Sequence, residues 1–433
     1  MTEPADSAGG AEGVVPVGDA ADQGSGYRPG ETAYRRVIVA LFAAGVATFA
    51  LLYAAQPLLP DFTAEFGVTP AVAAFSVSGT TLALGLALLV VGPSTEVLGR
   101  TPIIIASLFA SSIVGVLVAV APSWPVLLGL RALQGLALAG IPAVVVAYLR
   151  EEIDDSAHGV ATGVYIGGTA IGGMVGRLVV GGVTDLAGWR WGLAAVGLMG
   201  LVCALCVHLL LPRSRFFRPV AASRRGLVET TRRLLSDPAL VALYLVGAVA
   251  MGSFVATFNT IGFRLRGEPY LLGVAVSGLI YLSYASGSFS SAYAGRLADR
   301  LGRRTVLPVF FALTLVGLLV TLAAPLWLVA VGITVFAAGF FAVHGVASAW
   351  VAARAHAGGG GTGQATAFYL FCYYLGSSVF GAWAGTAWST GGWPRVIEMT
   401  GALVVVGVGL GLWLQRIPSL AEPPVEDEGV TAY

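Results

Sequence analysis

Two arginines stand out in this sequence because each lies inside a long apolar stretch, where charged side chains are rare. Arg131 interrupts residues 125–149, and Arg177 interrupts residues 159–183. Burying a guanidinium in hydrocarbon costs at least ~2.5 kcal/mol, so such a residue usually has a function or a specific partner. We predict that Arg131 contacts a substrate or a coupling residue. For Arg177, a functional role and a structural pairing remain equally open.

Polar and aromatic side chains of the other apolar stretches complete a candidate binding cavity. An apolar cavity with a few hydrogen-bonding groups suits amphipathic small molecules, although about half of the aromatic residues are expected to pack or face lipid. None of the 23 carboxylates falls in the middle of an apolar stretch. His344 could titrate instead, or it could simply be hydrogen-bonded. The predicted cavity residues are Gln56, Arg131, Gln134, Arg177, Asn259, Tyr281, Tyr284, His344, Tyr369 and Tyr373.

Several chemistries are excluded because the sequence contains no lysine: all 24 basic residues are arginines. A Walker A phosphate loop and a Schiff-base site both require lysine. Cys203 and Cys206 have the spacing of zinc ligands, but no further ligand lies nearby. The acidic run 151–155 suggests a polytopic membrane enzyme with a Mg²⁺–diphosphate site only remotely, since no second acidic motif completes it. We expect neither a metal nor another cofactor.

Membrane-spanning helices must position these residues. The sequence is 57% hydrophobic and 11% charged, with a mean hydropathy of +0.84, and a soluble fold cannot bury that much apolar surface. Its apolar runs are continuous and not alternating, which predicts an all-α membrane protein and not a barrel. The twelve predicted spans are residues 37–59, 71–93, 103–121, 125–149, 159–183, 189–211, 239–262, 271–295, 305–323, 325–349, 364–387 and 394–416.

The distribution of arginines predicts how the chain is oriented. With both termini in the cytoplasm, 18 arginines lie on the cytoplasmic side and four lie outside, and the opposite orientation would invert this bias. The longest polar interruption carries seven arginines and divides six spans from six. The predicted organisation is a disordered cytoplasmic tail (1–36), a six-helix bundle (37–211), a cytoplasmic loop (212–238), a second six-helix bundle (239–416) and a cytoplasmic C-terminal tail (417–433).

One short loop recurs in the two halves at an offset of 203 residues. Residues 92–101 read GPSTEVLGRT, and residues 295–304 read GRLADRLGRR. Glycines allow helices to approach closely, and an acid at the membrane edge can face the positive N-terminus of a helix in the other half. We expect these loops to close a cytoplasmic gate with the acids of 151–155, although Arg303 and Arg304 could only reflect the orientation bias. The predicted gate residues are Gly92, Glu96, Gly99, Arg100, Gly295, Asp299, Arg300, Gly302, Arg303 and Arg304.

The second copy of the loop matches the GxxxDRxGRR signature of the major facilitator superfamily, which the chain resembles over residues 37–416. Arg131–Gly135 looks like the family's RxxQG element, and Leu52–Pro60 ends the first span as in drug-efflux-like members. The glycine-rich fifth span resembles that of family antiporters. It departs from their pattern because Arg177 stands where a proline would be.

This resemblance implies two pseudo-symmetric six-helix bundles and a secondary active transporter of the cell membrane that works by alternating access. It implies proton-coupled efflux of an amphipathic compound, as in drug-efflux-like or sugar-efflux-like members. A uniporter or an importer of a small metabolite is the alternative, because a fold fixes neither direction nor substrate. The expected partners are a small-molecule substrate, a coupling proton and membrane lipid, for a monomer that does not bind nucleic acid.

Overall fold

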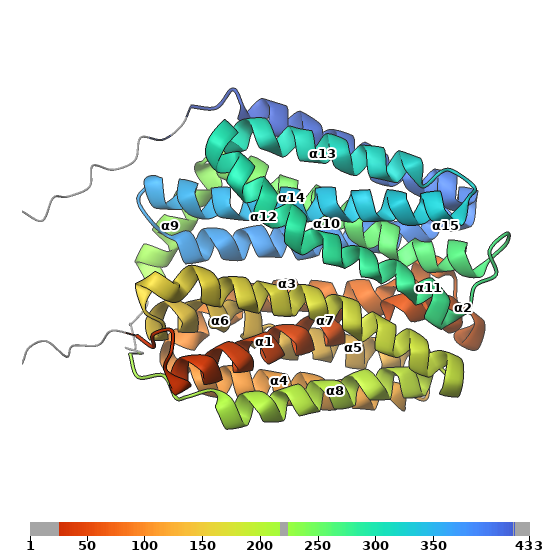
Figure 1. Cartoon of the computed structure of the whole chain (residues 1–433), viewed down its shortest axis with the longest axis horizontal. Helices are drawn as coiled ribbons and strands as arrows, with labels where there is room; N and C mark the ends of the chain where they lie inside the picture. The colour runs from red at the N-terminus through yellow and green to blue at the C-terminus, as the bar shows by residue number, and fades with distance from the viewer. Residues whose placement is uncertain (1–25, 217–223, 419, 421–433) are drawn as a thin grey trace, which may run out of the picture.

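The computed structural model of the chain consists of long helices that lie side by side in two groups (Figure 1). It describes residues 26–216, 224–418 and 420, without the side chains of residues 92–98, 143, 155, 224 and 225. Within these residues there is no β-strand, only an isolated bridge between Tyr27 and Ile153. Both ends of the described chain lie at one end of the molecule, which we call the tail end. The opposite end is called the far end.

Each group of helices corresponds to one half of the chain. The N-terminal half contains α1 (Thr32–Tyr53), η2 (Gln56–Leu58), α2 (Leu59–Phe66), α3 (Pro70–Leu98), α4 (Arg100–Ala119), α5 (Trp124–Leu138), α6 (Gly140–Glu152), η3 (Asp155–Ala157), α7 (His158–Ala187) and α8 (Trp189–Leu210). After α9 (Arg224–Ser236), the C-terminal half contains α10 (Pro238–Arg266), α11 (Val274–Gly278), η4 (Leu279–Tyr284), α12 (Ala285–Leu301), α13 (Arg303–Val320), α14 (Leu326–Ala357) and α15 (Thr362–Leu414).

Ten helical stretches of the described chain are long and apolar enough to cross a membrane. The predicted span 271–295 is divided among α11, η4 and α12, each of which is too short to qualify alone. Helix α15 has 53 residues, and its backbone leaves the helical conformation at Gly391 and Gly392. At 1.5 Å per residue it is about 80 Å long, enough for two crossings. The all-α membrane fold is therefore confirmed, and its helices are consistent with the twelve predicted spans.

The sequence repeat has a counterpart in the backbone. Gly99 joins α3 to α4 with a φ of 81°, and Gly302 joins α12 to α13 with a φ of 84°. Residues with a side chain rarely adopt this left-handed region, so glycine is needed at the same point of both loops. Gly188 and Gly392 form a second matched pair with positive φ, which places the break in α15 at the position equivalent to the α7–α8 junction.

Helices α1 and α7 pack through faces of small residues. A Cβ atom added at Gly172 would lie 2.5 Å from Cα of Val46, and one added at Gly176 would lie 2.6 Å from Cα of Ala50. A four-residue spacing on both helices keeps these residues on one face. The predicted role of the glycines in close helix contact is confirmed, because no side chain larger than hydrogen fits there.

The polar segments differ from their prediction in two places. Helix α1 begins at Thr32, and before it the backbone N–H of Tyr27 donates to the carbonyl of Glu152 at 2.7 Å. The disorder predicted for residues 1–36 is therefore wrong for 27–36, while residues 1–25 lie outside the described part. Segment 212–238 contains helix α9, whose Leu234 is buried. Its few apolar residues gave no signal of a helix.

The two halves meet through different helices at different depths. Helix α3 packs against α15, where the hydroxyl oxygens of Thr81 and Ser378 lie 2.8 Å apart. Helix α7 packs against α11 and η4, and contacts α12 much less. Figure 1 shows the reason: α12 slants away from the N-terminal half as it runs toward the tail end. Contact between the halves beside α7 is therefore concentrated toward the far end.

We expect Gly172→Leu to lower the thermal stability of the protein, because its side chain would overlap the α1 backbone. Overpacking of this kind costs typically ~1–3 kcal/mol. Gly167→Leu is the matched control, since an added Cβ at Gly167 meets no atom within 4 Å. Thermal unfolding of the purified proteins in detergent gives the comparison. Equal unfolding midpoints for the two variants would contradict close packing of α7 on α1.

Candidate substrate cavity

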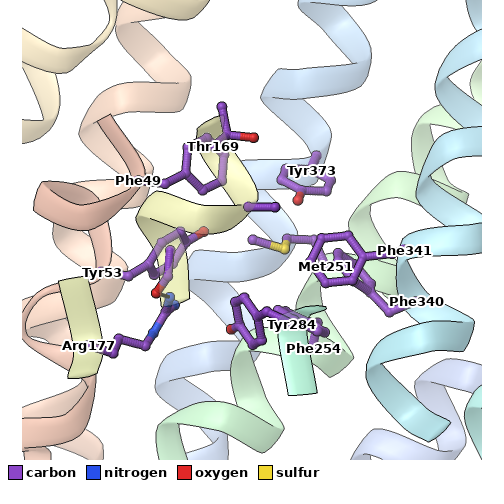
Figure 2. A pocket seen from close by; sticks show the side chains of 12 residues that line it. Phe49, Tyr53, Thr169, Arg177, Met251, Phe254, Tyr284, Phe340, Phe341 and Tyr373 are labelled. Carbon is purple, nitrogen blue, oxygen red and sulfur yellow. Dashed lines mark hydrogen bonds between the residues drawn. The ribbon is translucent and has the colours of Figure 1, made fainter. Parts of the chain in front are cut away.

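A cavity of about 40 Å³ lies between the two halves (Figure 2). From the N-terminal half, α1 and α7 contribute Phe49, Tyr53, Thr169, Ala170, Gly173 and Arg177. From the C-terminal half, helices α10, η4, α14 and α15 contribute Met251, Phe254, Tyr284, Phe340, Phe341 and Tyr373. Figure 2 shows Tyr53 and Arg177 on one side of this space, with Phe254, Met251 and Phe340 on the other. Both halves therefore line one site.

Arg177 is the charged group of the cavity, and the residue is only 2% exposed. Its Nε donates to Oε1 of Gln56 at 2.7 Å, and its Nη1 donates to the carbonyl of Gly173, one turn earlier in α7. The guanidinium carbon lies 4.7–4.9 Å from the ring centroids of three tyrosines, Tyr53, Tyr281 and Tyr284. No carboxylate of the described chain forms an ion pair with Arg177. Dipoles and ring faces compensate its charge instead.

A chain of hydrogen bonds leads from Arg177 across the boundary between the halves. Gln56, which accepts from Arg177, donates through Nε2 to Oδ1 of Asn259 at 2.7 Å. Asn259 in turn donates through Nδ2 to the carbonyl of Gly381 at 3.1 Å. Gln56 and Asn259 are 203 residues apart, which is also the offset of the loop repeat. The structure thus brings together three predicted cavity residues.

Aromatic side chains of the C-terminal half form the opposite wall. Phe254 stacks on Phe340 with ring centroids 3.9 Å apart. Behind them, Nδ1 of His344 lies 2.9 Å from the hydroxyl oxygen of Tyr369. Its imidazole ring is 4.8 Å from the ring of Tyr373. Two predicted residues of this half, Tyr284 and Tyr373, therefore line the cavity, while Tyr281, His344 and Tyr369 lie behind it.

Arg131 and Gln134 lie apart from this cavity, beside a void of about 10 Å³. Arg131 donates from Nε to the carbonyl of Ser76 at 2.8 Å and from Nη1 to Oε1 of Gln134 at 2.5 Å. Two more bonds, of 2.9 and 2.5 Å, reach the carbonyls of Leu51 and Leu52. These carbonyls belong to the last turn of α1, the negative end of its helix dipole. Arg131 is structurally paired, and its contact with a substrate stays a prediction.

The far end carries links between the halves that the sequence analysis missed. Arg266 donates to both carboxylate oxygens of Asp61, at 2.5 and 3.0 Å. Asp185, near the end of α7, accepts from the backbone N–H groups of Val274 and Ala275 at 2.9 and 2.8 Å. One signal was available: Asp61 and Arg266 each follow the first predicted span of their own half, 205 residues apart. We call the Asp61–Arg266 pair the far-end latch.

The predicted gate lies at the tail end, around the α3–α4 and α12–α13 turns. The side chains of Gly92 and Glu96 lie outside the described residues. Gly99 and Gly302 form the two turns, with Gly295 one helix turn before the second of them. Asp299 and Arg300 are exposed, while Arg303 and Arg304 are partly buried. Among the described side chains, no ion pair joins the acids of 151–154 to Arg300, Arg303 or Arg304.

Each of these acids has another partner. Arg100 donates to Glu151 at 2.7 Å within the same half, and Glu152 accepts from the backbone N–H of Arg215 at 2.5 Å. The Ser156 hydroxyl and Arg28 hold the pKa of the exposed Asp154 below its ordinary value. The three carboxylates therefore do not converge, and the described residues contain no cluster of metal ligands at this turn.

Comparison with known proteins places this geometry in context. The sequence model of the Major Facilitator Superfamily matches residues 41–379. YybF, an MFS-type transporter of Bacillus subtilis (strain 168), is 40% identical over 390 residues, covering 90% of this chain and 96% of the relative. YnfM, an inner membrane transport protein of Escherichia coli (strain K12), is 43% identical over 387 residues, covering 89% and 92%.

Solved structures share the fold at low sequence identity. A bacterial homologue of the human lysosomal transporter Spinster, in an inward-facing and unoccupied conformation, has a TM-score of 0.70 and 14% identity, covering 89% of this chain and 98% of that chain. A mutant of the nucleoside transporter NupG has a TM-score of 0.71 and 13% identity, covering 87% and 99%. At these identities the likeness concerns the arrangement of the helices alone.

We expect charge reversal at the latch to separate the two halves at the far end. In Asp61→Arg or Arg266→Asp, two like charges would face each other, whereas the double reversal restores attraction. Double electron–electron resonance between spin labels at Ala64 and Glu268, both exposed, measures the separation in a variant without the three native cysteines.

Longer distances in both single variants and the original distance in the double variant are expected. Arg190→Asp is the control, because Arg190 pairs with Glu65 at the same end but within one half. A single distance distribution across all the latch variants would show that Asp61 and Arg266 do not hold the far end together.

Proposed function

Because the chain belongs to the Major Facilitator Superfamily, whose members are transporters and not enzymes, we propose that it exports an amphipathic small molecule by alternating access. In such a mechanism, two bundles expose one central site to each side of the membrane in turn. The single observation that carries this proposal is the cavity lined by both halves. Its aromatic walls and few polar groups suit an amphipathic ligand.

The distribution of polar links between the halves supports a two-state mechanism. In this conformation the latch and Asp185 tie the far end together. No described ion pair ties the halves at the tail end, where α12 slants away from α7. We propose that the opposite state closes the tail end through the acids of 151–155 and the arginines after α12. Asp299 would then face the N-terminus of α7, where the helix dipole favours an anion.

The arginine bias supports a cytoplasmic tail end in the cell membrane. On that orientation, the conformation described is the one in which substrate enters from the cytoplasm. Export follows from the resemblance to drug-efflux-like and sugar-efflux-like members. A uniporter or an importer would use the same cavity and the same two gates, because the fold fixes no direction. We further propose that the monomer, surrounded by lipid, is the functional unit.

Proton coupling requires a group that can gain and lose a proton near the cavity. The twelve lining residues include no Asp or Glu. His344 contacts the ring of the lining residue Tyr373 and shares a hydrogen bond with Tyr369. We propose that His344 carries the coupling proton, since histidine changes charge near neutral pH in water. Its protonation would add a second positive charge behind the aromatic wall.

The test is a transport assay in proteoliposomes that hold an imposed pH gradient. In vesicles whose tail end faces outward, an acidic interior should drive uptake of an amphipathic substrate as protons leave. His344→Gln should abolish this acceleration but retain exchange at equal pH. His208→Gln is the control, because His208 is an exposed residue of α8 outside the cavity lining.

Uptake that ignores the gradient in the unmodified protein would favour the uniporter. Gradient-driven uptake that survives in His344→Gln would remove His344 from the coupling. If no member of a broad panel of amphipathic compounds crosses the membrane in either direction, the proposed transport of such compounds is wrong.

A further inference from the structure

We infer that the cavity binds an organic anion, whose negatively charged head lies at Arg177 and whose apolar body lies against the C-terminal half. This inference rests on the proposed function, because it specifies the substrate of the same cavity. The chemical class is an aromatic or aliphatic body that carries one carboxylate, sulfonate or phosphate group. The shared chemistry of these groups is a compact set of acceptor oxygens with a negative charge.

The first argument is charge balance. Arg177 is 2% exposed, lines the cavity and forms no ion pair within the described chain. A buried cation without a counter-ion is costly, and residues of this kind inside membrane spans face a partner or a substrate pathway. An anion in the cavity would be that partner. Arginine suits the task because its planar guanidinium binds two oxygens of such a group at once.

Arg131 shows that this protein compensates a buried arginine fully where no ligand is needed. Its four acceptors include two carbonyls at the negative end of α1. Arg177 has only Gln56, which also bonds across the interface, and Gly173 of its own helix. The two arginines are buried to the same degree, so the difference lies in their partners. Only Arg177 borders the cavity.

Two hydroxyl groups beside Arg177 point to the same kind of ligand. Tyr53 and Tyr284 are 2% and 5% exposed, and neither hydroxyl oxygen has a hydrogen-bond partner in the structure. An unpaired buried hydroxyl costs roughly 1–3 kcal/mol. Both rings lie against the guanidinium, so their hydroxyl groups belong to the same site. An anionic head could accept hydrogen bonds from the arginine and from these hydroxyl groups together.

The remainder of the lining sets the rest of the ligand. On the far side of the cavity from Arg177, Met251, Phe254, Phe340 and Phe341 offer only carbon and sulfur surface (Figure 2). An apolar, preferably aromatic, body fits this wall. A cationic amphiphile is disfavoured, because no lining carboxylate would balance it and Arg177 would repel it. The volume of about 40 Å³ admits only a small head group, so the body enters as the aromatic side chains or the halves move apart.

The test compares three compounds with the same naphthalene body: the sulfonate, its neutral sulfonamide and an aminomethyl cation. The full-length protein is placed in nanodiscs of zwitterionic lipid, and thermal unfolding is followed against ligand concentration. A ligand that binds the folded state raises the unfolding temperature in a saturable manner. We expect saturable stabilisation by the sulfonate and by the matching carboxylate or phosphate ester, and none by the cation.

Arg177→Gln should weaken anion binding by about tenfold or more, because it removes charge-assisted hydrogen bonds. Arg177→Lys should retain part of the binding, and Tyr284→Phe should weaken it by a smaller factor. Arg395→Gln is the matched control, since it removes an arginine of equal charge that is exposed and pairs only with Glu398. If Arg177→Gln does not fold, Arg177→Lys and Tyr284→Phe still decide the outcome.

The inference is overturned if none of the three anions stabilises the protein, if the cation binds as well as the sulfonate, or if the Arg177 and Tyr284 variants bind like the control. Transport of the same compounds in proteoliposomes separates this result from the proposed function. Transport of neutral or cationic compounds alone would leave the transporter intact and refute the anion site. Arg177-dependent anion binding without transport would support the site and refute the proposed function.

Discussion

A positive charge buried between two helical bundles must be compensated where it lies, and Arg177 imposes this constraint on the centre of the fold. The close packing of α7 on α1 brings the guanidinium to Tyr53, and the absent side chain of Gly173 leaves room for it: an added Cβ there would lie 3.3 Å from Nη1. The other half completes the environment with Tyr281 and Tyr284. The site therefore exists only when the bundles are together, which ties the binding chemistry of the protein to the relative position of its halves.

Internal duplication explains where the halves touch. In a structure with pseudo-two-fold symmetry, equivalent residues meet only near the symmetry axis, as they do in an isologous dimer. Gln56 and Asn259 are separated by the repeat offset and form a hydrogen bond with each other, so the two first helices of the halves meet at that axis. Beyond this point the halves have diverged. The N-terminal half supplies the buried cation and the glycine face, and the C-terminal half supplies stacked aromatic rings.

The sequence predicts those features that depend on local composition. Continuous apolar length predicts helical spans, and the recurrent loop predicts the positions where Gly99 and Gly302 need positive φ. It does not reveal how Arg131 and Arg177 differ, because both are lone arginines in apolar stretches. Their difference arises from acceptors 55 to 121 residues away in the chain. The broken span at η4 and the far-end latch were missed for a similar reason: bends and ion pairs between helices leave no periodic signal in composition.

The compensation of Arg177 also restrains movement of the halves. Separation at the far end would leave Arg177 with Gln56 and Tyr53 of its own half and remove the rings of Tyr281 and Tyr284, each contact contributing ~0.5–2 kcal/mol. It would also break the hydrogen bond between Gln56 and Asn259. An empty cavity has nothing to replace these interactions, whereas an anion held against the guanidinium compensates its charge in both arrangements. On the anion proposal, occupancy therefore lowers the cost of opening the far end, so the loaded protein changes state more readily than the empty one.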